Sequence, residues 1–535
     1  MLPSLLALVS TLLVQVQKPP AAPAPTNHDR YVITLPKDLD AALGLKDGDA
    51  GAGRLLLFFI REGVRPVQGD PIDAPFYSKP QPLASVDLSS FKAGSSVTID
   101  GKSLSWPTSV DDLDGTYRVQ AAYRRNPDAR SHQAEGNLFS GVKTVELAAD
   151  RGDEVAINLD QRFPNEPLPE RPNLKWFSMK SKLLSDALGR DVTMRAGVVF
   201  PKNYDKLDAK RRIWPTIYVV PGFGGDHTMA LHYASMMATP NIDAIAPQAV
   251  YVVLDPDCRL GHHAFADSEC NGPRGEALVR EFIPALEKRF RLEPRPEGRI
   301  VTGHSSGGWS SLWLQLAYPD VFGACFSSAP DPVDFTAFQL SDLYHDANLM
   351  TDADGHEQAS FRQPLGPEQD RVMMTVREET GVEHVLGPRN DSGEQWGTWA
   401  SMFSRKDPAT GLPHRMFDPE TGVIDHKVVE DEWSRYDIAR LTEKNWAKYG
   451  PTFASKVHLV CGDRDSYYLQ RAVERLRDKV EALRKADLDA GRTPATGNGY
   501  IEIVPRATHE TLVPLTTVRF NEEMIAHLRR HGLHD

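Results

Sequence analysis

The sequence predicts an α/β protein with a β-rich region in front of it, and three observations support this fold class. Residues 27–165 contain short β-branched runs separated by turn clusters, which is typical of a β-sandwich. From residue 177 onward, apolar strands alternate with helical stretches, which indicates a mostly parallel sheet with helices on both faces. The chain has 535 residues, of which 41% are hydrophobic and 25% are charged, so it is long enough for more than one domain.

The first element, residues 1–26, joins an apolar run to a Pro/Ala-rich spacer. The run of about fifteen apolar residues is shorter than a membrane span and fits the hydrophobic part of an export signal. We therefore expect a signal peptide, a secreted or periplasmic location, and no stable membrane insertion after the signal is removed. A buried N-terminal helix is the alternative.

The net charge bears on possible binding partners, and the cysteine content bears on possible disulfides. The formal net charge is -12 and no long basic run is present, so nucleic acid is a poor candidate partner. Four cysteines are too few for a disulfide scaffold. Cys258 and Cys270 flank one Gly/His-rich loop and are candidates for a disulfide, whereas Cys325 and Cys461 lie in apolar runs that are typical of buried thiols.

A Pro-rich linker, residues 166–176, is expected to join the β-sandwich to the α/β domain of residues 177–535. Two strands, near residues 177–184 and 191–200, should open this domain on either side of a Gly-Arg-Asp turn. A turn-rich and aromatic-rich insertion, residues 334–450, interrupts the alternation of strands and helices.

The location of the insertion between two strands predicts that it forms a wall or lid of a substrate pocket. Trp396 and Trp399 are the expected substrate contacts, because rigid aromatic side chains bind flat or apolar groups at a low entropic cost. In the alternative interpretation, the aromatic side chains form the insertion's own small core.

The stretch GRIVTGHSSGGWSSLWLQLAYPD, residues 298–320, predicts a nucleophilic serine. Gly303 and Gly307 flank Ser305 in a G-x-S-x-G pattern, with a strand before it and apolar residues at helical spacing after it. In such a strand-turn-helix the glycines allow close backbone approach, and the serine hydroxyl projects from the sheet edge. A plain Gly/Ser-rich turn is the alternative.

A serine hydroxyl needs a base and an orienting acid before it can attack a carbonyl. His509 follows the last predicted strand and fits the base, while Asp465 follows the strand before it and fits the acid. Two other carboxylates stay open as the acid: Asp463, which is also placed to cap the turn, and Asp331, which follows an earlier strand.

The negatively charged oxygen that forms during acyl transfer needs two backbone N–H donors. The residue after the nucleophile, Ser306, is expected to supply one of them. The Gly-rich loop VVPGFGGDH should supply the other from Phe223, with Gly224 as the neighbouring candidate.

These segments resemble the putative-esterase family of α/β-hydrolases, which includes esterase D, feruloyl esterases and enterochelin-esterase-like enzymes. The resemblance rests on PGFGG, on DSECNGPRGEALVREFIPALEKRFR leading into GHSSGGWSSLWLQLAYPDVFGA, and on GDRDSYYL and ATHE. It covers residues 175–335 and 430–530, and it implies a triad of Ser305, Asp465 and His509. The insertion and the β-sandwich depart from the family pattern and leave the substrate open.

The expected function is hydrolysis of a carboxylic ester, either of a small molecule or of a glycan, through an acyl-enzyme intermediate. The mechanism needs no cofactor, and the sequence shows no metal-ligand spacing. An acyltransferase or a peptidase with the same triad is one alternative. A catalytically silent binding protein that uses its β-domain is another.

Overall fold

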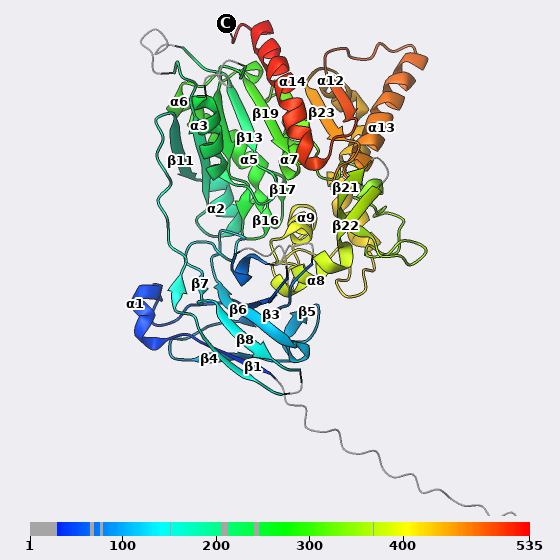
Figure 1. Cartoon of the computed structure of the whole chain (residues 1–535). Coiled ribbons are helices and arrows are strands. Elements are labelled where there is room, and N and C mark those ends of the chain that lie inside the picture. Colours follow the sequence, from blue (N-terminus) through cyan, green and yellow to red (C-terminus); the bar gives the residue numbers. More distant parts are fainter. Residues whose placement is uncertain are drawn as a thin grey trace, which may run out of the picture.

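A computed structural model describes residues 29–64, 69–74, 79–149, 151–204, 212–239, 245–366 and 369–534. The β-rich N-terminal region lies below the α/β region in Figure 1, and the insertion lies beside both. The predicted signal peptide and spacer fall outside these ranges, so export stays a prediction. Within the described ranges, no helix combines the length and the apolar character that crossing a membrane requires.

The N-terminal region contains two sheets, as expected of a β-sandwich. The larger sheet consists of β10 (Gln161–Arg162), β7 (Leu138–Phe139), β6 (Gly115–Arg124), β2 (Gly53–Arg61), β3 (Leu83–Leu88) and β5 (Leu104–Trp106), with β8 (Lys143–Leu147) also paired to β6. The smaller sheet consists of β4 (Ser96–Ile99), β1 (Arg30–Thr34) and β9 (Glu154–Asn158).

Strand β2 is buried on both of its faces, which is unusual for a sandwich strand with one solvated face. Leu55, Leu57 and Phe59 belong to the core between the two N-terminal sheets. The alternate side chains, Leu56 and Phe58, belong to a separate apolar cluster that extends into the insertion. The N-terminal region is therefore joined to the rest of the molecule through its larger sheet.

The α/β region is built on one eight-stranded sheet. Its order is β11 (Leu174–Lys180), β12 (Thr193–Val199), β14 (Val250–Leu254), β13 (Thr216–Val220), β19 (Arg299–His304), β20 (Ala324–Ser328), β23 (Val457–Gly462) and β24 (Tyr500–Val504). The first two pairings are antiparallel and all later ones are parallel. The predicted mostly parallel sheet is thus confirmed.

Helices cover both faces of this sheet. They include α3 (Ala230–Ala238), α6 (Ile283–Phe290), α7 (Ser306–Ala317), α13 (Gln470–Asp489) and α14 (His509–Arg530). The strands β13 and β14 are buried along their whole length because they are covered from both sides. This arrangement brings the carboxyl ends of β19, β23 and β24 to one edge.

The start of the α/β region differs from the expectation in one respect. The second half of the predicted strand 177–184 is a helix, α2 (Lys182–Leu188). The Ser181 hydroxyl accepts a hydrogen bond from the Leu184 N–H at 3.1 Å, which caps the helix, and Gly189 ends it with a left-handed φ of 65°. These capping residues, rather than the apolar run, decide the local structure.

The insertion lies between β20 and β23 and has secondary structure of its own. It contains β21 (Ala359–Gly366), β22 (Gln369–Thr375), α8 (Val376–Leu386), α9 (Gln395–Phe403), α10 (His426–Asp431), α11 (Ile438–Lys444) and the start of α12 (Trp446–Ser455). Several of its aromatic rings pack together, and Phe403 and Trp433 lie 5.2 Å apart between ring centroids. Part of its aromatic content therefore does form a core.

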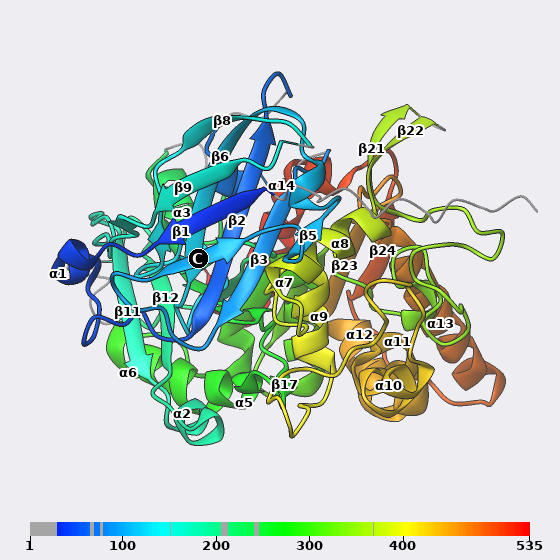
Figure 2. The same ribbon diagram turned by 90° about the horizontal axis from the view of Figure 1, so that it is seen from below.

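Helix α8 connects the insertion to the N-terminal region, as Figure 2 shows beside β3 and β5. Val382, Val385 and Leu386 on α8 pack in one apolar cluster with Leu56 and Phe58 of β2. Because both sides of this contact are apolar and buried, the N-terminal region and the insertion support each other.

Polar contacts at this interface are also buried. The Arg54 guanidinium donates to the Leu386 carbonyl at 2.6 Å and to the Asp391 carboxylate at 3.2 Å. The Ser85 hydroxyl donates to the Val385 carbonyl at 2.7 Å. These bonds fix the position of the insertion relative to the N-terminal sheets.

Candidate active site

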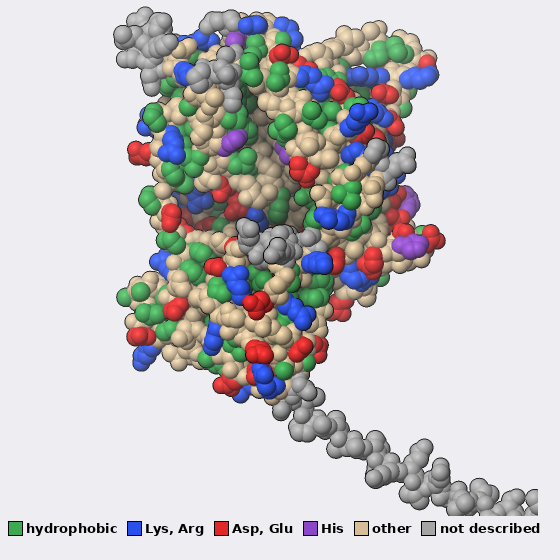
Figure 3. Space-filling model, viewed as in Figure 1, with side chains coloured by type: hydrophobic (Ala, Val, Ile, Leu, Met, Phe, Trp, Pro, Cys, Tyr) green, Lys and Arg blue, Asp and Glu red, His purple; other side chains and the backbone are tan. Residues whose placement is uncertain are grey.

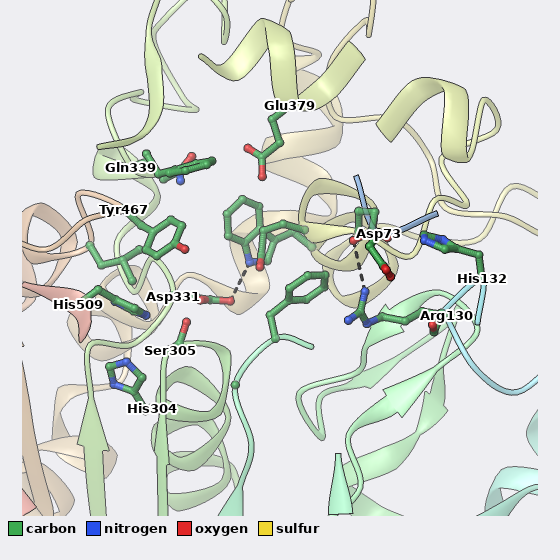
Figure 4. Close-up of a pocket in the computed structure, with 18 of the residues that line it drawn as sticks. Asp73, Arg130, His132, His304, Ser305, Asp331, Gln339, Glu379, Tyr467 and His509 are labelled. Carbon is green, nitrogen blue, oxygen red and sulfur yellow. Dashed lines mark hydrogen bonds and ion pairs between the residues drawn. The ribbon is translucent and has the colours of Figure 1, made fainter. Parts of the chain in front are cut away.

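Ser305 lies on the tight turn between β19 and α7, where its backbone adopts φ 61° and ψ -129°. A positive φ is strained for a residue with a Cβ atom, and such strain is typical of a functional site. A Cβ on Gly303 would lie 2.2 Å from the Gly307 carbonyl oxygen, and one on Gly307 would lie 2.0 Å from the Val220 oxygen. Both glycines are therefore needed for the turn that presents Ser305 to the cavity (Figure 4).

His509 begins α14 and meets Asp465, which follows β23. The His509 Nδ1 and Asp465 Oδ2 atoms are 2.7 Å apart, and the Asp465 side chain is fully buried. The other Asp465 oxygen accepts a hydrogen bond from the Tyr467 N–H at 2.9 Å. Because Asp465 holds Nδ1, the second imidazole nitrogen of His509 is left to face the cavity that Ser305 also lines.

The two competing carboxylates have other partners. Asp331 accepts hydrogen bonds from the Ser306 hydroxyl at 2.7 Å and from Trp399 Nε1 at 2.9 Å. Asp463 accepts from the Arg506 N–H at 2.6 Å on an exposed turn. Of the three candidate acids, Asp465 is the one that bonds to His509.

The electrostatics of the site favour different protonation states for its two histidines. Burial lowers the pKa of His509, but the charge of Asp465 and its hydrogen bond outweigh burial, so the pKa of His509 is raised overall. The His304 ring lies 4.3 Å from the His509 ring between centroids. Burial, together with the charge of His509, lowers the pKa of His304 to about 3, so His304 stays neutral.

The loop after β13 lies directly against the nucleophile turn, because a Cβ on Gly222 would be 3.0 Å from the His304 carbonyl oxygen. Phe223 in this loop lines the cavity. Gly224 adopts a φ of 83°. Ser306 is the first residue of α7, where backbone N–H groups lack partners within the helix. The predicted oxyanion donors therefore gather around Ser305.

The cavity has a volume of about 720 Å³ and is lined by three parts of the chain. Figure 3 shows the surface hollowed above the N-terminal region. The α/β region contributes the residues around Ser305 and His509, whereas the insertion contributes Gln339, Phe361, Glu379, Glu394, Gln395 and Trp399. The insertion thus forms a wall of the cavity, as the sequence predicts.

The two tryptophans that the sequence singles out have different positions. Trp399 lines the cavity. Trp396 lies one layer behind it, with the two ring centroids 4.9 Å apart, and its Nε1 donates to Glu379 at 3.0 Å. Of the two predicted substrate contacts, Trp399 therefore reaches the cavity, whereas Trp396 supports its wall.

The N-terminal region supplies the rest of the lining, which the sequence does not reveal. Ile72, Asp73, Arg130, Ser131, His132 and Gln133 all line the cavity. The Arg130 guanidinium lies 4.5 Å from the centre of the Phe223 ring, which places it over the loop of the predicted oxyanion donor. Arg130 also pairs with Glu394 at 3.3 Å and with Asp257 at 3.6 Å. No local motif marks Arg130 for this role.

The four cysteines and one acidic turn lie outside the described cavity lining. All four cysteines are buried free thiols, so the disulfide considered for Cys258 and Cys270 is not formed. Among the described residues, one group could hold a metal ion: Asp352, Asp354 and His356, on an exposed turn. It lies outside the cavity lining, and exposed acidic groups of this kind are common without an ion.

A serine on a strained strand-to-helix turn, at the carboxyl edge of a mostly parallel sheet and beside a histidine held by an aspartate, defines the chain as an α/β-hydrolase. The model of the putative esterase family matches residues 185–488, which is more than half of the chain. The chain therefore belongs to the putative esterase family, and it is an esterase that hydrolyses carboxylic esters.

Several solved structures resemble this chain at low identity. A ferulic acid esterase is 13% identical, with a TM-score of 0.35, over 66% of this chain and 99% of its own. A ferulic acid esterase from Anaeromyces mucronatus, in complex with ferulic acid, is 12% identical, with a TM-score of 0.33, over 68% and 97%. An S-formylglutathione hydrolase from Agrobacterium tumefaciens is 16% identical, with a TM-score of 0.35, over 67% and 95%. A search of curated proteins gives no match.

Proposed function

We propose that Ser305, His509 and Asp465 form a catalytic triad that hydrolyses esters through an acyl-enzyme intermediate. The free nitrogen of His509 takes the Ser305 proton while the serine oxygen attacks the ester carbonyl. His509 then returns the proton to the leaving alcohol, and the acyl group stays on Ser305. A water molecule, activated by His509, releases the acid in the same way.

The observation that carries this proposal is the 2.7 Å bond between His509 and Asp465, in a cavity that also contains Ser305. The bond fixes the imidazole tautomer that accepts a proton from serine, and it stabilises the imidazolium that forms. The raised pKa of His509 has the same cause and is consistent with a base that works near neutral pH.

The N–H groups of Phe223 and Ser306 are proposed to hold the oxygen that becomes negative during attack, with Gly224 as the neighbouring donor. Arg130 would keep this loop in place through its contact with the Phe223 ring. A volume of about 720 Å³ suits a small-molecule ester or the esterified end of a glycan.

The direct test is Ser305→Ala. The variant should fold and should lose about 10⁶ in kcat, because triad members act as a unit. A fluorophosphonate probe should label the wild-type protein on Ser305 and leave the variant unlabelled. Ser306→Ala is the matched control, because it removes a neighbouring hydroxyl but keeps the backbone N–H, so labelling should persist. Retained esterase activity or labelling in Ser305→Ala would refute the proposal.

A further inference from the structure

One carboxylate in the cavity has an oxygen without a partner. Glu379 on α8 is 8% exposed, and Figure 4 shows its carboxylate pointing into the cavity across from Ser305. One of its oxygens accepts hydrogen bonds from Trp396 Nε1 at 3.0 Å and from the Ser360 hydroxyl. No group in the described ranges donates to the other oxygen, which leaves it for a bound molecule.

Acidic side chains outnumber basic ones in the part of the cavity lining that the structure describes. That part contains four carboxyl groups, which belong to Asp73, Asp331, Glu379 and Glu394. Arg130 is the one Lys or Arg among these described lining residues, and it is already paired with Glu394 and with Asp257. Glu379 takes part in no ion pair within the described residues, so the described lining has an excess of carboxyl groups over cationic partners.

Two of the three histidines in the described lining, His132 and His304, do not offset this excess, and the third, His509, is already paired with Asp465. Burial lowers the pKa of His132 to about 4 and that of His304 to about 3, so both are neutral at pH 7. Glu383, one helical turn beyond Glu379, is also buried, and its pKa is raised well above the ordinary value by burial and by the Glu379 charge. Burial raises the pKa of Glu379 as well, which a cation in contact with it would reverse.

A second side chain of the lining also has an acceptor without a donor. Gln339 is 4% exposed, and its amide nitrogen donates to the Ser360 carbonyl at 3.2 Å. This bond fixes the amide orientation, and the Gln339 oxygen has no hydrogen-bond partner, although the atom itself is shielded from solvent and would have to turn to reach a bound molecule. The same cavity is lined by the aromatic side chains of Phe361, Trp399 and Tyr467.

We propose that this cavity binds the ammonium group of an ester substrate, with Glu379 as its counter-ion. An ammonium group brings a positive charge that would pair with Glu379 and N–H donors for the unpartnered Glu379 oxygen. It also binds to the faces of aromatic rings, which this lining contains. A sugar hydroxyl brings a donor but no charge, so it would leave Glu379 unpaired. The inference rests on the proposed esterase function and specifies the class of its substrate.

The test compares esters that differ only in charge. Methyl 6-aminohexanoate and methyl heptanoate form one isosteric pair on the acyl side, and methyl 3-aminopropanoate and methyl butanoate form a shorter one. Acetates of 6-aminohexanol and heptanol form the pair on the alcohol side. Acid release in a pH-stat at pH 7 gives the ratio of kcat/KM between the charged and the neutral ester of each pair.

The wild-type ratio should exceed one in at least one pair. Glu379→Gln keeps an oxygen for Trp396 and Ser360 but removes the charge, so it should lower that ratio about tenfold, the factor that corresponds to about 1.4 kcal/mol. Glu378→Gln is the matched control. Glu378 lies at the adjacent position of the same helix, outside the cavity lining, and glutamine can keep its capping bond to the Thr375 N–H. Its ratio should equal that of the wild type.

A wild-type ratio at or below one in every pair would overturn the inference even if the variant failed to fold. An unchanged ratio in a folded Glu379→Gln protein would also overturn the inference. So would the finding that glucose 6-acetate is the preferred ester and that its hydrolysis is the most sensitive to this substitution. If the protein hydrolyses the neutral esters and shows no preference for the charged ones, only the inference about the ammonium group is refuted. If the protein hydrolyses neither these esters nor p-nitrophenyl acetate, both the proposed function and the inference are refuted.

Discussion

Replacing Asp465 with asparagine tests which carboxylate orients His509. One Asp465 oxygen faces His509 Nδ1 at 2.7 Å, and the other accepts from backbone N–H groups of Tyr467 at 2.9 Å and Leu469 at 3.3 Å. An asparagine amide that keeps its oxygen on these N–H groups must turn its NH₂ group toward His509. The imidazole then adopts the tautomer that carries its proton on the nitrogen facing Ser305, and it cannot accept the serine proton.

The opposite orientation of the asparagine amide, with its oxygen toward His509, would favour the active tautomer but is not expected to form. It would place the NH₂ group against two backbone donors in a fully buried position, so it is disfavoured. We therefore expect Asp465→Asn to lower kcat by about 10⁴, as loss of the correct tautomer does in other triads. This factor corresponds to about 5 kcal/mol of lost transition-state stabilisation.

Asp331→Asn is the matched comparison, since it removes a second buried carboxyl group that acts on His509. Both donors to Asp331, the Ser306 hydroxyl and Trp399 Nε1, reach one carboxylate oxygen that the amide can retain. Its kcat for p-nitrophenyl acetate should fall by less than about tenfold, within the range of one neutral hydrogen bond. If Asp331→Asn lost more activity than Asp465→Asn, Asp331 would be the orienting acid and the assignment would be wrong.

Three further predictions follow from the geometry. Because Asp465 raises the pKa of His509, the acid limb of the kcat/KM profile should lie above the usual imidazole value of about 6.5, and Asp465→Asn should move any residual limb to lower pH. Arg54→Met leaves Asp391 buried with fewer partners and should lower the free energy of urea unfolding by about 3 kcal/mol, whereas no loss would show that the interface is not stabilising. Trp399→Ala should reduce kcat/KM for bulky esters much more than for p-nitrophenyl acetate, and equal losses would assign Trp399 to the scaffold.

The nucleophile turn could be predicted because its signal is local. A strand, two glycines around Ser305 and a helix follow one another within about twenty residues, so sequence pattern and backbone geometry coincide. The segment around Ser181 shows the limit of apolar pattern alone. Its first half is a strand and its second half a helix, and the difference is decided by a serine cap and by Gly189 rather than by hydrophobic periodicity.

The sequence left three candidates for the acid that orients His509, because the composition of a loop does not show in which direction each side chain points. Asp463 and Asp465 are two residues apart on one turn, yet Asp463 bonds to an exposed backbone N–H while Asp465 is buried against His509. Arg130 could not be predicted at all. Its contact with Phe223 joins segments that are distant in the sequence, and only tertiary packing brings them together.

The N-terminal sheets influence the cavity in two ways, and both depend on the buried larger sheet. The loop after β6 places Arg130 over Phe223 directly. Through β2, the apolar side chains of Leu56 and Phe58 fix one face of α8, and Glu379 projects from the neighbouring face of the same helix into the cavity. Because a helix moves largely as a rigid unit, a change in this apolar contact would displace the carboxylate without touching Ser305. Substrate preference in this esterase is therefore expected to respond to substitutions in the N-terminal sheets that leave the nucleophile turn intact.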